Sequence, residues 1–244
     1  MVKDPDISIV VPAYNEARRI VQTLEMLRNY LARQSYCAEV IVVDDGSTDD
    51  TAAIVDQICQ EWTALRLVRN PGNSGKGFGV RNGVLNARGK IVLFTDADLS
   101  APIEEMPKLV DPIVEGRCDL TFGSRALDRS LIGVHQSKVR EFSGRIFNLF
   151  VQLLTGLPFQ DTQCGFKAFR RDQAIPIFER QTIMDFGFDP EILYIARKRG
   201  LHLAEVPIHW NHVEGTKVRF LSDSLKMFLD LLLIRWNDFT GKYR

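Results

Sequence analysis

The first half of the chain alternates short apolar, β-branched runs with longer segments of helical periodicity. Such runs, bounded by polar loops, predict strands, and apolar residues recurring every three to four positions predict helices. The expected strands span residues 8–11, 40–43, 66–68, 91–94 and 120–122, and the helices between them span residues 17–32, 49–62, 76–87 and 104–115. This alternation predicts an α/β fold with a mostly parallel central sheet.

The pattern loosens after Ser124. A basic loop leads to an expected helix at about residues 139–154, and a further strand and helix follow. The chain closes with an expected amphipathic helix at about residues 221–236. Since no change in composition indicates a linker, we expect a single domain over residues 1–244.

Composition and charge exclude several classes of protein. Lys plus Arg and Asp plus Glu number 31 each, so no overall field favours nucleic acid as a partner. The 4 cysteines lack metal-site spacing, which favours reduced thiols in the cytoplasm. The N-terminus has no signal-peptide pattern, and the longest uncharged stretch, 146–160, is shorter than the roughly 20 apolar residues that span a bilayer. We expect a soluble or peripheral protein.

Polar loops follow the expected strands at the edge where the carboxyl ends of parallel strands meet. The first three loops read VPAYNE (residues 11–16), DDGSTDDT (44–51) and NPGNSGKGFGVRNG (70–83). The fourth reads TDADLS (95–100) and the fifth GSR (123–125). Polar loops gathered at one edge predict a binding pocket there.

Two aspartates one residue apart, Asp96 and Asp98, follow the apolar strand of residues 91–94. A lone Asp-x-Asp is usually just a turn, because aspartate ends strands and caps helices. Here the pair faces other polar loops, and in extended backbone residues i and i+2 project to the same side. Carboxylates so spaced suit Mg²⁺ or Mn²⁺, with substrate phosphates completing the shell. We therefore predict a metal and diphosphate site.

Motifs in a fixed order carry a resemblance to a known family. IVVPAYNEARRI, VIVVDDGSTDDT, NSGKGFGVRNG, FTDADLS and GSR resemble the inverting glycosyltransferases of family two. DTQCGFKAFRR (161–171), FGFDPEILYIA (186–196) and HVEGTK (212–217) resemble its dolichyl- and polyprenyl-phosphate branch, most of all the dolichyl-phosphate β-glucosyltransferases. The resemblance covers about residues 7–232. It implies the GT-A nucleotide-diphospho-sugar fold, a Rossmann-like three-layer sandwich with C-terminal amphipathic helices.

The resemblance implies that residues 1–124 bind a nucleotide sugar together with Mg²⁺ or Mn²⁺. The matching donor positions are Pro12, Tyr14, Glu16, Asp44, Asp45, Lys76, Asp96, Ala97 and Asp98. The first three hold the nucleoside, and Asp44 and Asp45 read the base and ribose. Ordinary alternatives remain, since Asp45 suits a turn and Lys76 suits a solvated helix start. A helix start itself favours an anion, which supports a diphosphate at Lys76.

The resemblance implies that residues 125–244 bind the acceptor. Arg125 matches a phosphate-contacting arginine, and the guanidinium fork grips phosphate with two bonds. Asp189 orients the sugar or the acceptor, or else caps the helix that Pro190 starts. The expected catalytic residues are Asp96, Asp98, Arg125 and Asp189, and the expected ligands of the acceptor phosphate are Arg125, Arg140 and Lys217.

A basic cluster, Lys138, Arg140 and Arg145, leads into an apolar helix, and the last helix is apolar on one side with Arg235 and Trp236 at its end. Such helices often pack in a core. Their wide apolar faces and terminal Trp and Arg also fit helices that lie in a membrane surface. Together with the family, they predict a protein on the cytoplasmic face of a membrane.

The expected reaction transfers a hexose to a polyprenyl (dolichyl-type) phosphate with inversion. Glucose from UDP-glucose is preferred, because DTQCGFK and EGTK resemble the glucosyl branch. One alternative is a mannose synthase that uses GDP-mannose, although those enzymes often carry DADLQ where Ser100 stands here. Another is a soluble family-two enzyme with a different acceptor.

Three further alternatives fit less well. Processive synthases carry Gln-x-x-Arg-Trp, but Leu232 stands at the glutamine position before Arg235. Sugar nucleotidyltransferases open with a G-x-G-T-R-like loop where this chain has VPAYNEARR. A binding module without activity has no need to retain both aspartates, Lys76 and Arg125.

Overall fold

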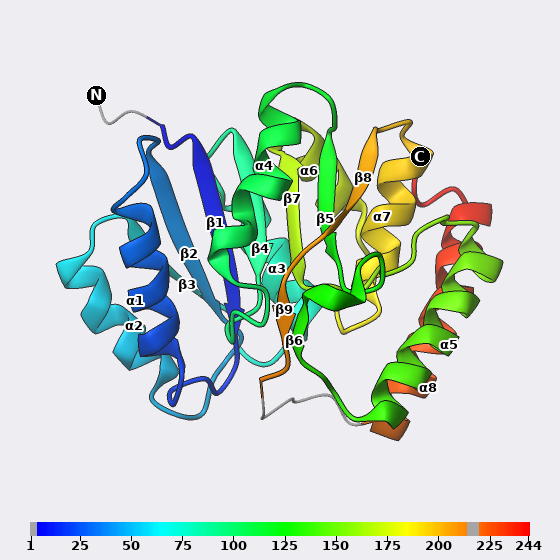
Figure 1. The fold of residues 1–244 in the computed structure, drawn as a ribbon, viewed down its shortest axis with the longest axis horizontal. Coiled ribbons are helices and arrows are strands. Elements are labelled where there is room, and N and C mark those ends of the chain that lie inside the picture. Colours follow the sequence, from blue (N-terminus) through cyan, green and yellow to red (C-terminus); the bar gives the residue numbers. More distant parts are fainter. Residues whose placement is uncertain (1–3, 214–219) are drawn as a thin grey trace.

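The computed structural model describes residues 4–213 and 220–244 (Figure 1). Within them, a 7-stranded sheet has the order β3-β2-β1-β4-β7-β5-β8. Its strands are β1 (Ile7–Ala13), β2 (Ala38–Asp44), β3 (Leu65–Arg69), β4 (Ile91–Thr95), β5 (Leu120–Ser124), β7 (Phe166–Arg170) and β8 (Leu203–Pro207). β7 is antiparallel to both neighbours and the other pairs are parallel, which confirms the mostly parallel α/β sheet.

Helices cover both faces of the sheet (Figure 1). One layer holds α1 (Ile20–Leu31), α2 (Thr51–Glu61), the short η1 (Ile103–Glu105) and α4 (Met106–Val114). The other holds α3 (Lys76–Leu85), α6 (Arg171–Arg180), α7 (Phe188–Lys198) and the paired helices α5 (Lys138–Thr155) and α8 (Phe220–Phe239). Successive β1 residues face opposite layers, since Ile9 and Val11 join the first core and Val10 the second. The arrangement is a three-layer sandwich.

The expected and observed elements differ in three places. Between α5 and α8 the sequence predicted one strand and one helix, whereas the structure has β7, α6, α7 and β8. The first helix starts at Ile20 rather than residue 17, because the backbone N–H groups of Glu16 and Ala17 donate to Thr51 and Asp49 of the following loop. Beyond Ser124, the sequence did not predict η2 (Arg129–Leu131) or the small sheet of β6 (Ile132–Val134) and β9 (Trp210–Asn211). Both strands are too short to give a periodic signal.

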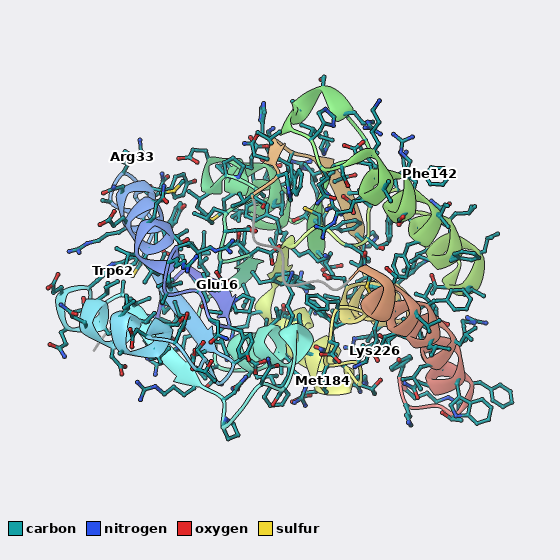
Figure 2. All side chains as sticks on the ribbon, turned by 90° about the horizontal axis from the view of Figure 1, so that it is seen from below. Glu16, Arg33, Trp62, Phe142, Met184 and Lys226 are labelled. Atoms are coloured by element: carbon teal, nitrogen blue, oxygen red, sulfur yellow. The ribbon has the colours of Figure 1, made fainter. Side chains whose placement is uncertain are left out.

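The paired helices α5 and α8 stand at one end of the molecule (Figure 1) and expose many large apolar side chains. Phe142 is 65% exposed and points outward from α5 in Figure 2. The others are Val139, Ile146, Leu149, Phe150 and Leu153 on α5, and Leu225, Leu229, Leu232, Leu233, Trp236 and Phe239 on α8. Among the described residues, no helix combines the length and the apolar character needed to cross a bilayer.

Asp230 of α8 gives the fold a pH-dependent stability. It is 8% exposed and packs on Gly187, and its Oδ2 has no hydrogen-bond partner among the described residues. Burial raises the pKa of Asp230 to about 6, against the opposing charge of Lys226. The unfolded pKa is about 3.9, so between roughly pH 4 and 6 the folded chain binds more protons than the unfolded chain. The free energy of unfolding therefore falls as pH rises through that window.

We expect Asp230→Asn to remove this loss and to stabilise the chain at pH 7.5 by about 1–3 kcal/mol, because the amide has no charge to desolvate. Urea unfolding at pH 4.5 and 7.5 measures the effect. Asp4→Asn, at an exposed aspartate, is the matched control. An unchanged pH dependence in Asp230→Asn would contradict the assignment.

Candidate active site

The strands β1, β2 and β4 end at the lower edge of the sheet in Figure 1. Residues that follow these strands line a cavity of about 1130 Å³. The residues predicted from sequence that line it are Pro12, Tyr14, Glu16, Asp45, Lys76, Asp96, Ala97, Asp98, Arg125, Arg140 and Asp189. Asp44 is buried and is not among the lining residues, and Lys217 falls outside the described residues. Segments that are far apart in the sequence therefore converge on one space.

Asp96 follows β4 directly and pairs with the first residue of α3. Lys76 Nζ lies 2.6 Å from Asp96 Oδ1. Burial by itself lowers the pKa of Lys76, but Asp96, Asp189 and Asp98 outweigh it and raise that pKa, so the ammonium stays charged. The backbone of Gly165 closes over the carboxylate, and a Cβ there would overlap both Asp96 oxygens. Lys76 and Gly165 thus hold Asp96 at the cavity wall.

Asp98 sits in a tight turn after the same strand. Its Oδ1 accepts from the Ser100 backbone N–H at 2.9 Å, and Leu99 between them has a φ of 46°. Its Oδ2 lies 4.0 Å from Arg19 Nη1. The turn that the sequence suggested is present, and Asp98 still lines the cavity.

The two aspartates fit a divalent cation that is bound together with a ligand. Asp96 and Asp98 supply carboxylate oxygens at the cavity surface, with side chains 33% and 25% exposed. In the described part of the chain, no group of three or more His, Cys, Asp or Glu forms a fuller metal cage. A hard cation here needs oxygens from elsewhere, which is how Mg²⁺ is held by one or two carboxylates plus substrate phosphates.

The two aspartates after β2 have different surroundings. Asp45 accepts from the backbone N–H groups of Ser74 and Gly75 at 3.0 and 2.8 Å and from Asn70 Nδ2 at 2.7 Å. It thereby fixes the glycine-rich loop before Lys76. Asp44 accepts from the Ser47 N–H through Oδ2, while its buried Oδ1 has no partner among the described residues.

The loop after β1 forms the neighbouring wall of the cavity. Arg19 Nε lies 2.6 Å from Glu16 Oε2, and both residues line the cavity. The Glu16 backbone N–H donates to Thr51 Oγ1 at 2.7 Å, which ties this loop to the one after β2. Pro12 and Tyr14 complete the wall. The predicted nucleoside positions therefore occupy one continuous surface.

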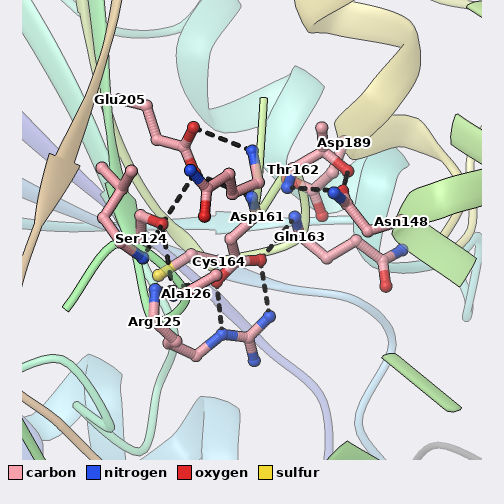
Figure 3. A network of polar contacts seen from close by, with 12 residues as sticks. Ser124, Arg125, Ala126, Asn148, Asp161, Thr162, Gln163, Cys164, Asp189 and Glu205 are labelled. Atoms are coloured by element: carbon pink, nitrogen blue, oxygen red, sulfur yellow. Dashed lines mark hydrogen bonds and ion pairs between the residues drawn. The ribbon is translucent and has the colours of Figure 1, made fainter. Parts of the chain in front are cut away.

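Arg125 is held by Asp161, which was not among the site residues predicted from the sequence. Its Nε and Nη2 donate to Asp161 Oδ2 and Oδ1 at 2.6 and 2.8 Å (Figure 3). Glu205 in turn accepts from the Asp161 backbone N–H at 2.7 Å. Burial raises the pKa of Asp161, but Arg125 outweighs it and holds that pKa below its usual value. Two of the three guanidinium nitrogens are thus committed to positioning.

Asp189 lines the cavity from α7 and pairs with a fully buried lysine. Lys167 Nζ lies 2.5 Å from Asp189 Oδ1 and 2.6 Å from the Cys164 carbonyl oxygen. Lys167 is 0% exposed and Asp189 3%. Burial raises the pKa of Asp189, although Lys167 and Lys76 oppose the shift. Asp189 makes no side-chain cap at the start of α7, where Gly187 is the N-cap residue.

The far end of the cavity is cationic and then apolar. Arg140 of α5 lines it, and within the described residues no carboxylate pairs with its guanidinium. Lys138 and Arg145, the rest of the predicted basic cluster, do not line the cavity. Beyond Arg140, the lining residues are Ile146, Phe147, Phe150, Leu225, Met227 and Phe228.

Sequence reasoning missed the residues that support the predicted ones. Asp161, Lys167 and Glu205 act through Arg125 or Asp189, and Trp210 lies 5.5 Å from the Arg125 guanidinium. One signal was available for Lys167, because a lysine inside the apolar strand FKAFR needs a buried partner. The others are defined only by tertiary contacts.

The chain is similar in sequence to known proteins of one family. The family model described as "Glycosyl transferase family 2" matches residues 8–178. A dolichyl-phosphate beta-glucosyltransferase of Trichomonas vaginalis is 35% identical, over 93% of this chain and 72% of its own length. The enzymes of that name from Saccharomyces cerevisiae and Homo sapiens are 34% and 33% identical, over 98% of this chain and 76% and 77% of their own lengths.

Solved structures show the same fold. Glucosyl-3-phosphoglycerate synthase from Mycobacterium tuberculosis, in complex with Mn²⁺, UDP and glucosyl-3-phosphoglycerate, matches with a TM-score of 0.64 at 22% identity. The match covers 95% of this chain and 78% of that one. The same enzyme has been solved with Mg²⁺ and UDP, and that structure also has a TM-score of 0.64. The predicted GT-A fold is confirmed.

Proposed function

This chain belongs to glycosyl transferase family 2, and from that premise we propose that it transfers glucose from UDP-glucose to a dolichyl-type polyprenyl phosphate with inversion. The single observation that carries the proposal is the course of the cavity. One space runs from the Asp96–Lys76 pair, past Arg125 and Arg140, to an apolar end between α5 and α8. Such a space fits a nucleotide sugar followed by an anionic lipid.

The donor end has groups for each part of a nucleotide sugar. The Glu16 carboxylate lines the cavity and is an acceptor suited to ribose hydroxyls, whereas Asp44, which the sequence predicted to read the nucleoside, does not line it. The Lys76 ammonium begins α3, and a helix start favours a diphosphate. The relatives named as glucosyltransferases support glucose. The neighbouring fold solved with UDP-glucose supports UDP as the carrier.

Asp96 and Asp98 are the residues that would hold Mg²⁺ or Mn²⁺. When bound, such a cation offsets the negative charge of the departing nucleoside diphosphate. Mn²⁺ and Mg²⁺ in the structures of similar fold support this choice. Lys76 contributes a second positive charge to the same leaving group, since its raised pKa keeps it protonated.

The acceptor end requires no general base. A phosphate monoester has a second pKa of about 6, so a polyprenyl phosphate is already a nucleophilic anion at neutral pH. Arg140 and the remaining guanidinium nitrogen of Arg125 bind and orient it, with Lys217 as a further candidate. Asp189, held by Lys167, orients the sugar for attack on its anomeric carbon from the face opposite the diphosphate. Inversion gives the β-linked product.

The outer face of α5 and α8 fits peripheral contact with the cytoplasmic face of a membrane. Its exposed side chains include Phe142, Leu153, Trp236 and Phe239. Large exposed apolar side chains along a pair of helices are typical of a membrane or protein contact. Since the proposed acceptor is a membrane lipid, this face would bring the cavity to its substrate, with residues 1–124 on the donor side and 125–244 on the acceptor side.

A panel of nucleotide sugars, incubated with a polyprenyl phosphate and Mn²⁺ or Mg²⁺ and analysed by mass spectrometry, tests the proposal. We expect a polyprenyl-phosphate hexose from UDP-glucose. Product only from GDP-mannose would assign the mannose-synthase alternative. Transfer to a soluble acceptor, with none to the lipid, would overturn the proposed acceptor.

We expect Arg140→Ala to raise the acceptor KM by about 10- to 100-fold, because a hydrogen-bonded charge pair with phosphate contributes about 1.5–3 kcal/mol. The KM for UDP-glucose should stay unchanged. Steady-state kinetics with each substrate varied in turn measures the effect. Arg145→Ala, on the same helix but outside the cavity, is the matched control. Equal effects of the two substitutions would contradict the role of Arg140.

A further inference from the structure

The start of α3 is held by the loop of residues 181–184, which connects α6 to α7. The Met184 carbonyl oxygen accepts from the Phe78 backbone N–H at 2.9 Å, and Met184 lies beside α3 in Figure 2. Gln181 Nε2 donates to the Gly77 carbonyl oxygen at 3.0 Å. A Cβ at Gly77 would lie 2.9 Å from the Met184 carbonyl oxygen, so the two backbones touch. Any displacement of this loop therefore moves the first turn of α3.

The loop is held in turn by Glu191 of α7, which is 0% exposed. Glu191 Oε1 accepts from the Thr182 hydroxyl at 2.6 Å, and Oε2 accepts from the Ile183 backbone N–H at 2.9 Å. The Thr182 backbone N–H donates to both oxygens, at 3.0 and 3.1 Å. Glu191 does not line the cavity. Its carboxylate thus fixes the loop without reaching the space that a substrate would occupy.

A tyrosine that follows α8 supplies a further donor to the same carboxylate. Tyr243 is 2% exposed, and its hydroxyl donates to Glu191 Oε1 at 2.6 Å. Burial and the negative charge of Glu191 raise the pKa of Tyr243, so the hydroxyl keeps its proton and donates. Asn237 Nδ2 of α8 donates to the Thr182 and Tyr243 hydroxyl oxygens at 2.8 and 3.3 Å. One buried carboxylate therefore joins the end of α8 to the loop that holds α3.

We propose that Glu191 is a positioning residue for the donor, which acts through the loop of residues 181–184 on Lys76 and the start of α3, and that Tyr243 stabilises Glu191 in this role. The inference rests on the proposed function and deepens it, since it concerns the proposed diphosphate end of the cavity. Lys76 is the first residue of α3. A hydrogen bond weakens steeply as its geometry is lost, and a helix start acts on an anion only within its first turn. A displaced loop should therefore weaken diphosphate binding.

A purely structural role for Glu191 predicts a different result. If this side chain only held α7, α8 and the loop together, its loss would lower the melting temperature, but the chain that remains folded would bind UDP with unchanged affinity. Positioning predicts a weaker affinity in the folded chain itself. Calorimetric titration of the full chain with UDP in the presence of Mn²⁺, well below the melting temperature and without an acceptor, distinguishes the two roles.

Tyr243→Phe is the sharpest variant, because it removes one hydroxyl and keeps the ring. We expect the Kd for UDP to rise by about 3- to 10-fold, since the Glu191 carboxylate loses one of its donors. Glu191→Gln, which brings an amide N–H against the backbone donors of the loop, should raise the Kd by about tenfold or more. Hydrogen exchange of the Phe78 amide should become faster in both variants, because Met184 holds it less tightly. The KM for UDP-glucose should rise in parallel, with the KM for the polyprenyl phosphate unchanged.

Tyr194→Phe is the matched control. Tyr194 is a second buried tyrosine between α7 and α8, and its ring centroid lies 6.1 Å from that of Tyr243. Its hydroxyl donates to Asp238 Oδ2 and accepts from Arg235 Nη1, both at 2.7 Å, and neither partner belongs to the loop of residues 181–184. The control should lower the melting temperature as Tyr243→Phe does and leave the Kd for UDP unchanged.

The outcomes separate the inference from the proposed function. An unchanged Kd for UDP in Tyr243→Phe would overturn the positioning role while the proposed function stands, whether or not Glu191→Gln folds. An equal rise of the Kd in Tyr194→Phe would also overturn it, since the effect would then come from the packing of α7 on α8. Absence of UDP binding by the unmodified chain would overturn the proposed donor and the inference together.

Discussion

Asp98→Asn is expected to lower kcat by at least about 100-fold while the chain stays folded. The substitution removes one of the two carboxylates proposed to hold the cation that offsets the charge of the departing diphosphate. The amide oxygen can still accept from the Ser100 N–H, so the turn after β4 is retained. Asp96→Asn should have a similar effect, since its amide oxygen still faces Lys76. Initial rates at saturating UDP-glucose and acceptor, together with melting temperatures, measure both parts of the expectation.

Removing the metal tests the proposed role of Asp96 and Asp98 independently of the substitutions. Treatment with a chelator should abolish transfer by the unmodified chain, and added Mn²⁺ or Mg²⁺ should restore it. Asp172→Asn, which changes an exposed aspartate, should leave the rate unchanged. Full activity after chelation would show that Asp96 and Asp98 act on the sugar or on the loop instead of on a cation.

The convergence of the residues expected to bind the donor could be predicted from the sequence because most of them stand next to a strong local signal. Asp96 and Asp98 directly follow an apolar strand, and Asp45 and Lys76 lie in loops between clear strand and helix patterns. In a parallel sheet the carboxyl ends of neighbouring strands meet, so placing the strands was enough to gather their loops. The cavity brings these residues together as expected.

The residues that support the site depend on tertiary contacts, which no local sequence pattern reveals. β7 lies between β4 and β5 and runs antiparallel to both, which brings Lys167 beneath the cavity. The fork between Arg125 and Asp161 joins residues that are 36 positions apart. Both residues lie in motifs recognised in the sequence, but only the tertiary structure shows that Arg125 pairs with Asp161.

The environments of helices α5 and α8 could not be predicted from the sequence either. The apolar patterns of these helices fitted a core as well as a membrane surface, and the family resemblance favoured the membrane. In the structure each helix does more than one of these tasks. Val151 and Leu231 are buried in the second core, Phe142 and Trp236 are exposed, and Phe150 lines the cavity. A helix with three environments has an apolar periodicity that favours none of them, so only packing distinguishes its faces.

The second large effect is expected at the buried ion pair below the cavity. Lys167→Met should lower the free energy of unfolding by about 3–5 kcal/mol, because it leaves the Asp189 carboxylate buried without its partner. Methionine fits the space of the lysine stem beside the Phe94 ring, which lies 5.4 Å from Nζ, so little packing is lost. Urea unfolding at pH 7 measures the change, with Lys198→Met at the surface as the control.

The double variant Lys167→Met with Asp189→Leu separates the charge from the space it occupies. If the loss in Lys167→Met comes from an unpaired carboxylate, removing that carboxylate as well should recover more than half of the lost free energy, even though the Cys164 carbonyl still lacks its donor. The double variant should be folded yet inactive, because nothing remains to orient the sugar. Strictly additive losses in the two single variants would show that the pair is not coupled and that each side chain acts through packing alone.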